Sequence, residues 1–347
     1  MKTVFGLGAI LMWPTLCLAG TSASLAFEYK DWSLACENTG TCRAAGYQTE
    51  ENISHPVSVL LTRKAGPDTA VLAQVQISHE DEKFLEQIKG TPYLSLYING
   101  RPLGSIILKR DNARGTLSKQ QTQHLLTALK GSSQIVFSLG KEQWQLSDQG
   151  ATAVLLKMDA FQNRVDTASA LIRFGNVSQD KVIKAQSMPV LTKTYRPGTA
   201  RHFALNSPQA KALITKFKKT ADREGCPILF EANYPDHDQI TVYPLDKQNV
   251  VVESPCWRGA YNAGSGYWVM DPQLKQVKHL ATTQGSSFSE GEIFAHHKGR
   301  GLGDCWSRQE WVWTSNGFVE SYNATTGQCK GFAGGAWQLP TFVSQVK

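Results

Sequence analysis

The sequence predicts a mainly β protein of the α+β class, divided into two domains. Many short segments alternate apolar with polar residues and are separated by Gly, Pro, Asn and Asp, as the strands of antiparallel sheets are. About 320 residues remain after an N-terminal leader, more than one hydrophobic core usually serves. We expect an N-terminal β domain with accessory helices over 27–176, a linker over 177–204, and a helix followed by a disulfide-stapled antiparallel β domain over 205–347.

Residues 1–26 are expected to be a secretory signal peptide. Lys2 precedes an apolar stretch over 4–18, which is shorter than a bilayer-spanning helix and is interrupted by Pro14. Small residues follow, and cleavage after Ala23 or after Ala26 would place one of them at the cut; we favour Ala26. The mature chain is therefore expected to be periplasmic.

The charge balance argues against nucleic acid as a partner. Without Lys2 the chain has 35 basic and 29 acidic residues, and the excess is spread along the chain rather than collected in Lys/Arg runs. No later segment is apolar for long enough to cross a membrane. We expect a mildly basic surface that could attract anionic glycans, anionic lipids or another envelope protein.

The expected N-terminal domain combines strands with two helices. Asn99-Gly100 lies between two strand-like segments and is a strong hairpin signal. Ser118 and Gln121 can form a capping box that begins one helix, and Gly131 can end it. A second helix over 151–165 has one apolar face. The expected strands cover 58–62, 71–77, 93–98, 105–109 and 135–139.

The expected C-terminal domain begins with a helix and continues as strands. Ser207 can cap the helix, Pro208 fits its first turn and Gly225 can end it. Its lysine-rich outer face is typical of a solvated surface. After Cys226, segments bounded by turn residues predict strands over 239–243, 250–253, 266–270, 276–281, 310–314 and 317–322.

Six cysteines remain after the leader, and this even number in an exported chain predicts disulfides. Their wide spacing, with no C-x-x-C pair, disfavours zinc, and we expect no cofactor. Cys36 and Cys42 bracket a turn-forming sequence, so we pair them. For the rest we propose Cys226 with Cys256 and Cys305 with Cys329, with Cys226 to Cys329 as a rival pairing.

Four phrases, in order along the chain, carry a family resemblance. They are FEYKDWSLAC over 27–36 with TCRA following, AVLLKMDAFQNRV over 153–165, CWRGAYN over 256–262, and KGRGLGDC over 298–305. The chain resembles the bacterial secreted proteins grouped as domain of unknown function 1176, over nearly its whole mature length. Trp306 stands where that pattern leads us to expect glycine. The resemblance implies an exported protein and leaves the activity open.

The N-terminal half also resembles, more faintly, the invasion-associated locus B proteins, which have a tryptophan shortly before a cysteine. Trp32 and Cys36 carry this likeness. It implies a β-sandwich for the first domain and a role in the envelope.

The densest polar stretch covers 290–305. Its alternating glycines allow close backbone approach to a ligand, and Lys298 and Arg300 beside them could hold an anionic group. The alternative is that Arg300 pairs with Asp304 inside a disulfide-closed turn and only shapes the domain. Nearby aromatic residues are expected to line a cleft. The candidate ligand-binding residues are Lys298, Arg300, Asp304, Trp257, Tyr261 and Trp306.

The sequence offers no catalytic or metal-binding pattern. His296 and His297 are adjacent, so on a strand they would point to opposite faces and could not chelate one metal together. No serine stands in G-x-S-x-G, and the cysteines are expected to be oxidised. A glycosidase could draw its two acids from Glu253, Asp271, Glu290, Glu292 and Asp304, whose separations the sequence does not define.

We favour a non-enzymatic periplasmic binding protein for an anionic envelope glycan or another envelope protein. The alternatives are a hydrolase that acts on envelope polysaccharide and a structural envelope interaction protein.

Overall fold

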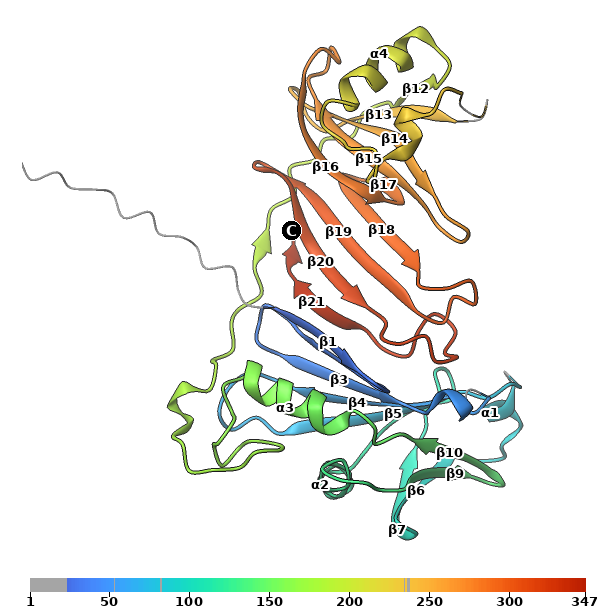
Figure 1. The fold of residues 1–347 in the computed structure, drawn as a ribbon, viewed down its shortest axis with the longest axis vertical. Coiled ribbons are helices and arrows are strands. Elements are labelled where there is room, and N and C mark those ends of the chain that lie inside the picture. The colour runs from blue at the N-terminus through green and yellow to red at the C-terminus, as the bar shows by residue number, and fades with distance from the viewer. Residues whose placement is uncertain (1–23, 53, 82, 234, 236–237) are drawn as a thin grey trace, which may run out of the picture.

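The computed structural model describes residues 24–347 except 53, 82, 234 and 236–237 (Figure 1). Most of the expected signal peptide, residues 1–23, lies outside the described residues. Strands hold 41% of the chain and helices 14%, and the four larger sheets are antiparallel, which confirms the mainly β fold. No described helix is long and apolar enough to cross a membrane.

The N-terminal half contains two antiparallel sheets. Across the larger sheet the strands are β1 (Leu25–Tyr29), β2 (Trp32–Cys36), β3 (Cys42–Tyr47), β4 (Val57–Arg63), β5 (Val71–Ile77) and β8 (Arg114–Thr116). Across the smaller sheet they are β10 (Glu142–Leu146), β9 (Ile135–Leu139), β6 (Tyr93–Ile98) and β7 (Arg101–Ile107).

One hydrophobic core lies between these sheets and their helices. Trp32, Leu61 and Phe137 come from the strands and Met158 from a helix, and all four are fully buried. The helices are α2 (Lys119–Ala128) and α3 (Ala151–Phe161), with the short α1 (Phe84–Gln87) and the 3-10 turn η1 (Glu50–Asn52) in loops.

The local signals in this half are mostly confirmed. Ser118 and Gln121 form the expected capping box. Asn99 and Gly100 turn the β6–β7 hairpin with positive φ at both positions. β7 begins four residues before the predicted strand, because Pro102 and Gly104 hide the strand pattern at its start. The second helix ends at Phe161 rather than 165, since the chain takes a left-handed turn at Asn163.

Around that turn, charged residues of the second family phrase form a buried network. Asp159 accepts hydrogen bonds from the backbone N–H groups of residues 171 and 172 and lies 3.5 Å from the guanidinium of Arg63. Arg164, also fully buried, donates to carbonyl and hydroxyl groups of the 66–69 turn. Burial, with the neighbouring charge of Arg164, lowers the pKa of Arg63 to about 10. This network ties α3 to two loops, so its role is structural.

The expected linker contains regular structure at its end. The 3-10 turn η2 (Gln179–Lys181) is followed by β11 (Val190–Leu191), which pairs with the last strand, β22 (Gln345–Val346). Residues 201–204 form strand β12 (Arg201–Ala204), which pairs with the next strand along the chain. The sequence missed it because the strand is mostly exposed and lacks apolar alternation.

The C-terminal half consists of two packed five-stranded antiparallel sheets, with a helix on the first of them. Helix α4 (Pro208–Phe217) and the 3-10 turn η3 (Pro227–Phe230) cover the first sheet, and a second core lies between the two sheets. The first sheet runs β12, β13 (Gln239–Pro244), β14 (Val250–Arg258), β15 (Ala263–Met270) and β16 (Val277–Gly285). The second runs β17 (Ser287–Ser289), β18 (Glu292–Lys298), β19 (Trp306–Thr314), β20 (Gly317–Thr325) and β21 (Leu339–Val343).

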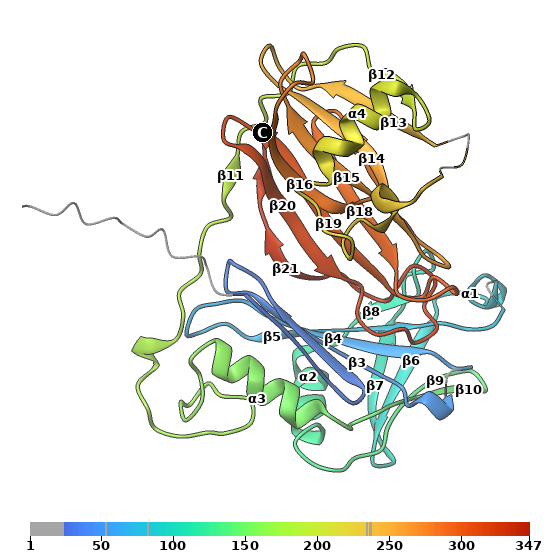
Figure 2. The same ribbon diagram turned by 45° about the horizontal axis from the view of Figure 1, so that its top comes forward.

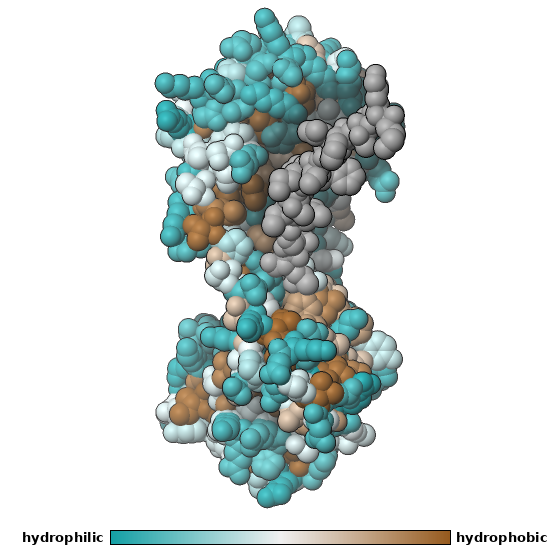
Figure 3. All heavy atoms as spheres, turned by 90° about the vertical axis from the view of Figure 1, so that its left-hand side faces the viewer, coloured by the Kyte–Doolittle hydropathy of each residue, from teal (hydrophilic) through white to brown (hydrophobic). Residues whose placement is uncertain are grey.

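The two halves meet as two lobes joined at a narrower waist (Figure 3). Figure 2 shows the second C-terminal sheet standing over the larger N-terminal sheet. Residues 326–338, here the strap, run along that N-terminal sheet between β20 and β21. Strap residues Phe332 and Trp337 pack with Tyr47 and Leu60 of the sheet in a core cluster of their own. Because this cluster covers the second face of the sheet, β2 is buried at every position.

Polar contacts complete the attachment of the strap. The Trp337 indole N–H donates to the Ser58 hydroxyl at 2.7 Å, and the guanidinium of Arg114 lies 4.8 Å from the Trp337 ring. Lys330, buried in the contact, pairs with Asp31 at 3.0 Å and with Glu50 at 2.7 Å.

The six cysteines in the described part of the chain form three disulfides: Cys36–Cys42, Cys226–Cys256 and Cys305–Cys329. These are the pairs that their local grouping favours. The first closes the β2–β3 hairpin, where the two residues face each other. The third joins the loop after β18 to the start of the strap.

Candidate functional site

The loop over 299–305, which joins β18 to β19, is built around an ion pair. The Arg300 guanidinium donates to both carboxylate oxygens of Asp304, at 2.8 and 2.5 Å, and also to the carbonyl of Cys329. Asp304 is buried and accepts a further bond from the backbone N–H of Gly331 at 2.8 Å. Arg300 holds the pKa of Asp304 below its usual range. Arg300 and Asp304 therefore face each other and fix the turn.

The glycines of this loop are needed for close packing and for one left-handed turn. A Cβ on Gly299 would lie 2.5 Å from the Cys305 sulfur, and one on Gly301 would lie 2.7 Å from the Tyr261 ring. Gly303 has a positive φ of 68°. The backbone at Gly299 and Gly301 thus approaches other groups of the protein, an arrangement that the sequence could not distinguish from approach to a ligand.

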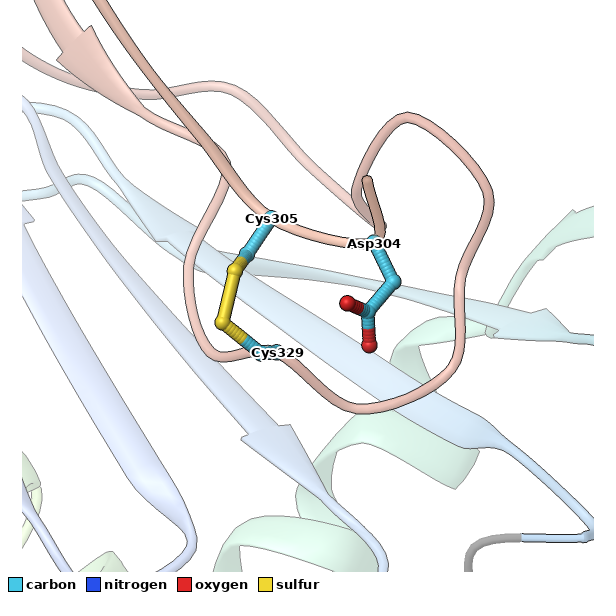
Figure 4. A group of neighbouring side chains, drawn as sticks. All are labelled: Asp304, Cys305 and Cys329. Carbon is cyan, nitrogen blue, oxygen red and sulfur yellow. A yellow bond between two sulfur atoms is a disulfide. The ribbon is translucent and has the colours of Figure 1, made fainter. Parts of the chain in front are cut away.

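Asp304, Cys305 and Cys329 lie close enough together to resemble a metal site (Figure 4). Their potential ligand atoms are within 4.8 Å of one another. The two sulfurs, however, are bonded to each other, and both carboxylate oxygens are used by Arg300 and Gly331. A disulfide sulfur is not the thiolate that binds metals, so this cluster closes a loop.

Lys298 and Trp306 come together at the base of the loop. They are paired across β18 and β19, and the Lys298 ammonium lies 5.5 Å from the centre of the Trp306 ring. The indole N–H donates to the Gly303 carbonyl at 2.8 Å, which fixes the ring. Two of the predicted site residues are thus neighbours on one face of the sheet.

Other cationic and aromatic residues continue the same face. Cross-strand pairing places His296 opposite Arg308, and Glu310 opposite Tyr322 on β20. Residues two apart on a strand share a face. We call this surface the basic–aromatic face and define it by His296, Lys298, Trp306, Arg308, Glu310 and Tyr322.

Contacts within the basic–aromatic face hold its charges in place. Arg308 donates to Glu310 at 2.5 Å, and its guanidinium lies 5.0 Å from the centre of the Tyr322 ring. His296 lies 3.4 Å from the same Glu310 oxygen. The side chains of His296 and Arg308 are 42% and 45% exposed, whereas that of Glu310 is 11% exposed. The atoms presented to solvent are therefore mainly those of Arg308 and His296 rather than the carboxylate of Glu310.

A shallow pocket of about 310 Å³ opens on this face. It is bounded on one side by β19 and on the other by the strap, so Cys305–Cys329 and the strap both shape it. Its lining residues are His296, Gly303, Trp306, Ser307, Arg308, Thr326, Gly334 and Gln338.

The remaining predicted site residues lie elsewhere. The centre of the Trp257 ring lies 5.2 Å from that of His297. His297 and Lys298 are adjacent on β18, so their side chains point to opposite faces of the sheet. Trp257 therefore lies on the other face from Lys298 and Trp306. Tyr261 lies against Gly301 at the tip of the loop and is 62% exposed.

Sequence reasoning missed His296, Arg308, Glu310 and Tyr322 as members of one surface. The sequence feature that could have revealed this surface is the spacing of polar residues at every second position in β18 and β19, on either side of a glycine-rich turn. β18 was not predicted as a strand, because its polar end, His296 to Lys298, breaks the apolar pattern.

Comparison with known proteins gives a family. Residues 26–344 match the family described as Protein of unknown function (DUF1176). The chain belongs to the DUF1176 family. No curated protein and no solved structure matches it, and no comparison supports the fainter likeness to the invasion-associated locus B proteins. Membership of DUF1176 assigns neither an activity nor a binding partner.

Proposed function

We propose that this protein is a non-enzymatic binding protein of the bacterial periplasm that holds an anionic envelope glycan on the basic–aromatic face. The observation that carries the proposal is the arrangement of exposed charge. Lys298 and Arg308 each lie over an aromatic ring on one sheet face, while the acid beside them, Glu310, is turned inward.

This arrangement fits the chemistry of an acidic sugar. Guanidinium and ammonium groups bind carboxylate and phosphate through charge-assisted hydrogen bonds. The rings of Trp306 and Tyr322 offer apolar surface on which a sugar can stack. A shallow pocket of about 310 Å³ is at the small end of ligand sites, which suits one charged sugar unit of a longer chain lying across the sheet.

Four of the five candidate acids of a polysaccharide hydrolase have structural partners, and the fifth, Glu290, lies exposed in the turn between β17 and β18. Glu292 pairs with Lys193 at 2.8 Å, Glu253 accepts from the Tyr243 hydroxyl at 3.1 Å, and Asp271 accepts from two backbone N–H groups of its own turn. Asp304 is bound by Arg300. These partners favour the binding proposal over hydrolysis, which needs one carboxyl free to donate a proton and another to act as base or nucleophile.

A thermal-shift screen of the oxidised mature protein tests the proposal. A ligand that binds only the folded state raises the melting temperature. The screen compares anionic cell-wall fragments and lipopolysaccharide oligosaccharides with their neutral counterparts. We expect shifts with anionic glycans that high salt weakens. Shifts of equal size with neutral sugars, or no shift with any glycan, would contradict it.

A further inference from the structure

Two apolar side chains project at the end of the second C-terminal sheet. Leu302 is 78% exposed and Tyr261 is 62% exposed, the highest values among the large apolar residues of the described chain. Tyr261 lies in the β14–β15 loop and Leu302 in the β18–β19 loop, and the Tyr261 ring packs against Gly301, next to Leu302. We call these two residues the apolar tip.

The apolar tip is held on rigid loops. The side chain of Asn262 donates to the Lys298 carbonyl and accepts from the Lys298 backbone N–H, at 2.9 and 2.8 Å, which joins the two loops. The Cys305–Cys329 disulfide and the Arg300–Asp304 pair close the loop that carries Leu302. An exposed leucine side chain on a fixed loop buries little apolar surface and so contributes little to the stability of the fold. Its preorganised position favours contact with something outside the chain.

The groups around the apolar tip present positive charge. Arg258 pairs with Asp238, and Arg300 pairs with Asp304. The guanidinium side chains are 43% and 35% exposed, but the two acidic side chains are only 7% and 4% exposed. The exposed atoms of these two ion pairs are therefore mainly those of the guanidinium groups, and Glu50 is an exposed acid within electrostatic range of Arg300.

We propose that the apolar tip docks on the surface of an anionic lipid bilayer. Leu302 would enter the boundary between headgroups and acyl chains, and Tyr261 would lie at the headgroup level, where aromatic rings with a polar end are favoured. The basic residues would contact lipid phosphates, since each cation near an anionic membrane surface adds to binding. The proposal rests on the tip and on Arg258 and Arg300, none of which belongs to the basic–aromatic face, so it does not depend on glycan binding.

Vesicle sedimentation tests the proposal on the purified mature protein. The vesicles are equal mixtures of phosphatidylglycerol and phosphatidylcholine, or phosphatidylcholine alone, at low salt. We expect wild type to sediment with the anionic vesicles, and Leu302→Asp to lower its partitioning about tenfold or more, because the carboxylate opposes both insertion and the anionic surface. The matched control is Ile107→Asp, since Ile107 is 59% exposed on β7.

Several outcomes would overturn the proposal. They are no sedimentation of wild type, equal sedimentation of Leu302→Asp and wild type, or equal binding to neutral vesicles. Concentration-dependent dimerisation that Leu302→Asp abolishes, without vesicle binding, would make the tip a contact with a second copy instead. If Leu302→Asp fails to fold, the milder Leu302→Ser replaces it. We expect Leu302→Ser also to bind anionic vesicles more weakly than wild type.

The glycan proposal is separable in the same assay. Arg308→Ala should keep vesicle binding, and Leu302→Asp should keep any glycan-induced thermal shift.

Discussion

Replacing Trp337 by alanine is expected to destabilise the protein by about 4 kcal/mol. Trp337 is 3% exposed and lies between the strap and the larger N-terminal sheet. A buried aromatic side chain removes roughly 150–250 Å² from water, and at about 25 cal/mol per Å² most of that contribution is lost on truncation. The lost contact with the Arg114 guanidinium adds about 0.5–1 kcal/mol.

Urea unfolding followed by circular dichroism measures this change. Trp337→Phe is the matched control, since it keeps most of the apolar area and loses only the N–H bond to Ser58. The Ser58 hydroxyl still donates to the Gly46 carbonyl at 2.8 Å, so this variant should lose only about 1–1.5 kcal/mol. Because the strap couples the two halves, Trp337→Ala should also separate their unfolding into two transitions. A loss below about 1 kcal/mol for Trp337→Ala would refute the reasoning.

Three further predictions concern the loop and the N-terminus. Asp304→Asn should destabilise by about 1.5–3 kcal/mol at pH 7; because Arg300 lowers the pKa of Asp304 in the folded state, the difference in melting temperature from wild type should shrink as the pH falls below about 4. A constant difference down to pH 2 would contradict this. Replacing Cys305 and Cys329 by alanine opens a disulfide with a sequence separation of 24 and should cost about 3 kcal/mol, measured by urea unfolding against wild type; no loss would refute it. If the chain is exported as we expect, mass spectrometry of the mature protein should find Ser24 as the first residue, because β1 begins one residue later; a start at residue 27 would contradict this.

The signal peptide stays a prediction, and the pairing of β1 bears on where it would be cleaved. Leu25 and Ala26 are part of β1 and pair with Cys36 and Ala35 of β2. Cleavage after Ala26 would remove two of the five residues of that strand. From the sequence we favoured cleavage after Ala26 on the small residues around the cut alone. The pairing of β1 with β2 could not be used, because it depends on a partner strand elsewhere in the chain.

Local signals predicted the fold well where the cause of structure is local. The capping box at Ser118, the Asn99-Gly100 turn and the Cys36–Cys42 hairpin each depend on residues close in sequence. Strands with apolar alternation were found for the same reason. The division at 27–176, 177–204 and 205–347 stays a prediction.

Features that depend on distant partners could not be predicted. The burial of β2 on both faces follows from the strap, which comes about 300 residues later, with Trp337 bound to Ser58. Likewise, the basic–aromatic face is assembled from three strands, and only the register of β18 to β20 shows that Lys298, Arg308 and Tyr322 share a surface. The sequence identified Lys298 and Trp306 and offered the Arg300–Asp304 pair as an alternative, which the structure shows. It could not tell that Trp257 faces the other side.

The most direct test of glycan binding is an equilibrium titration with a soluble phosphorylated lipopolysaccharide core oligosaccharide. Arg308→Ala removes one cation from the basic–aromatic face, and Arg101→Ala removes an exposed strand arginine from the other half of the molecule. We expect Arg308→Ala to weaken binding about tenfold or more, since a hydrogen bond to a charged group contributes about 1.5–3 kcal/mol, and Arg101→Ala to leave it unchanged. Equal affinities for wild type and both variants, or no binding by the wild type, would contradict the account.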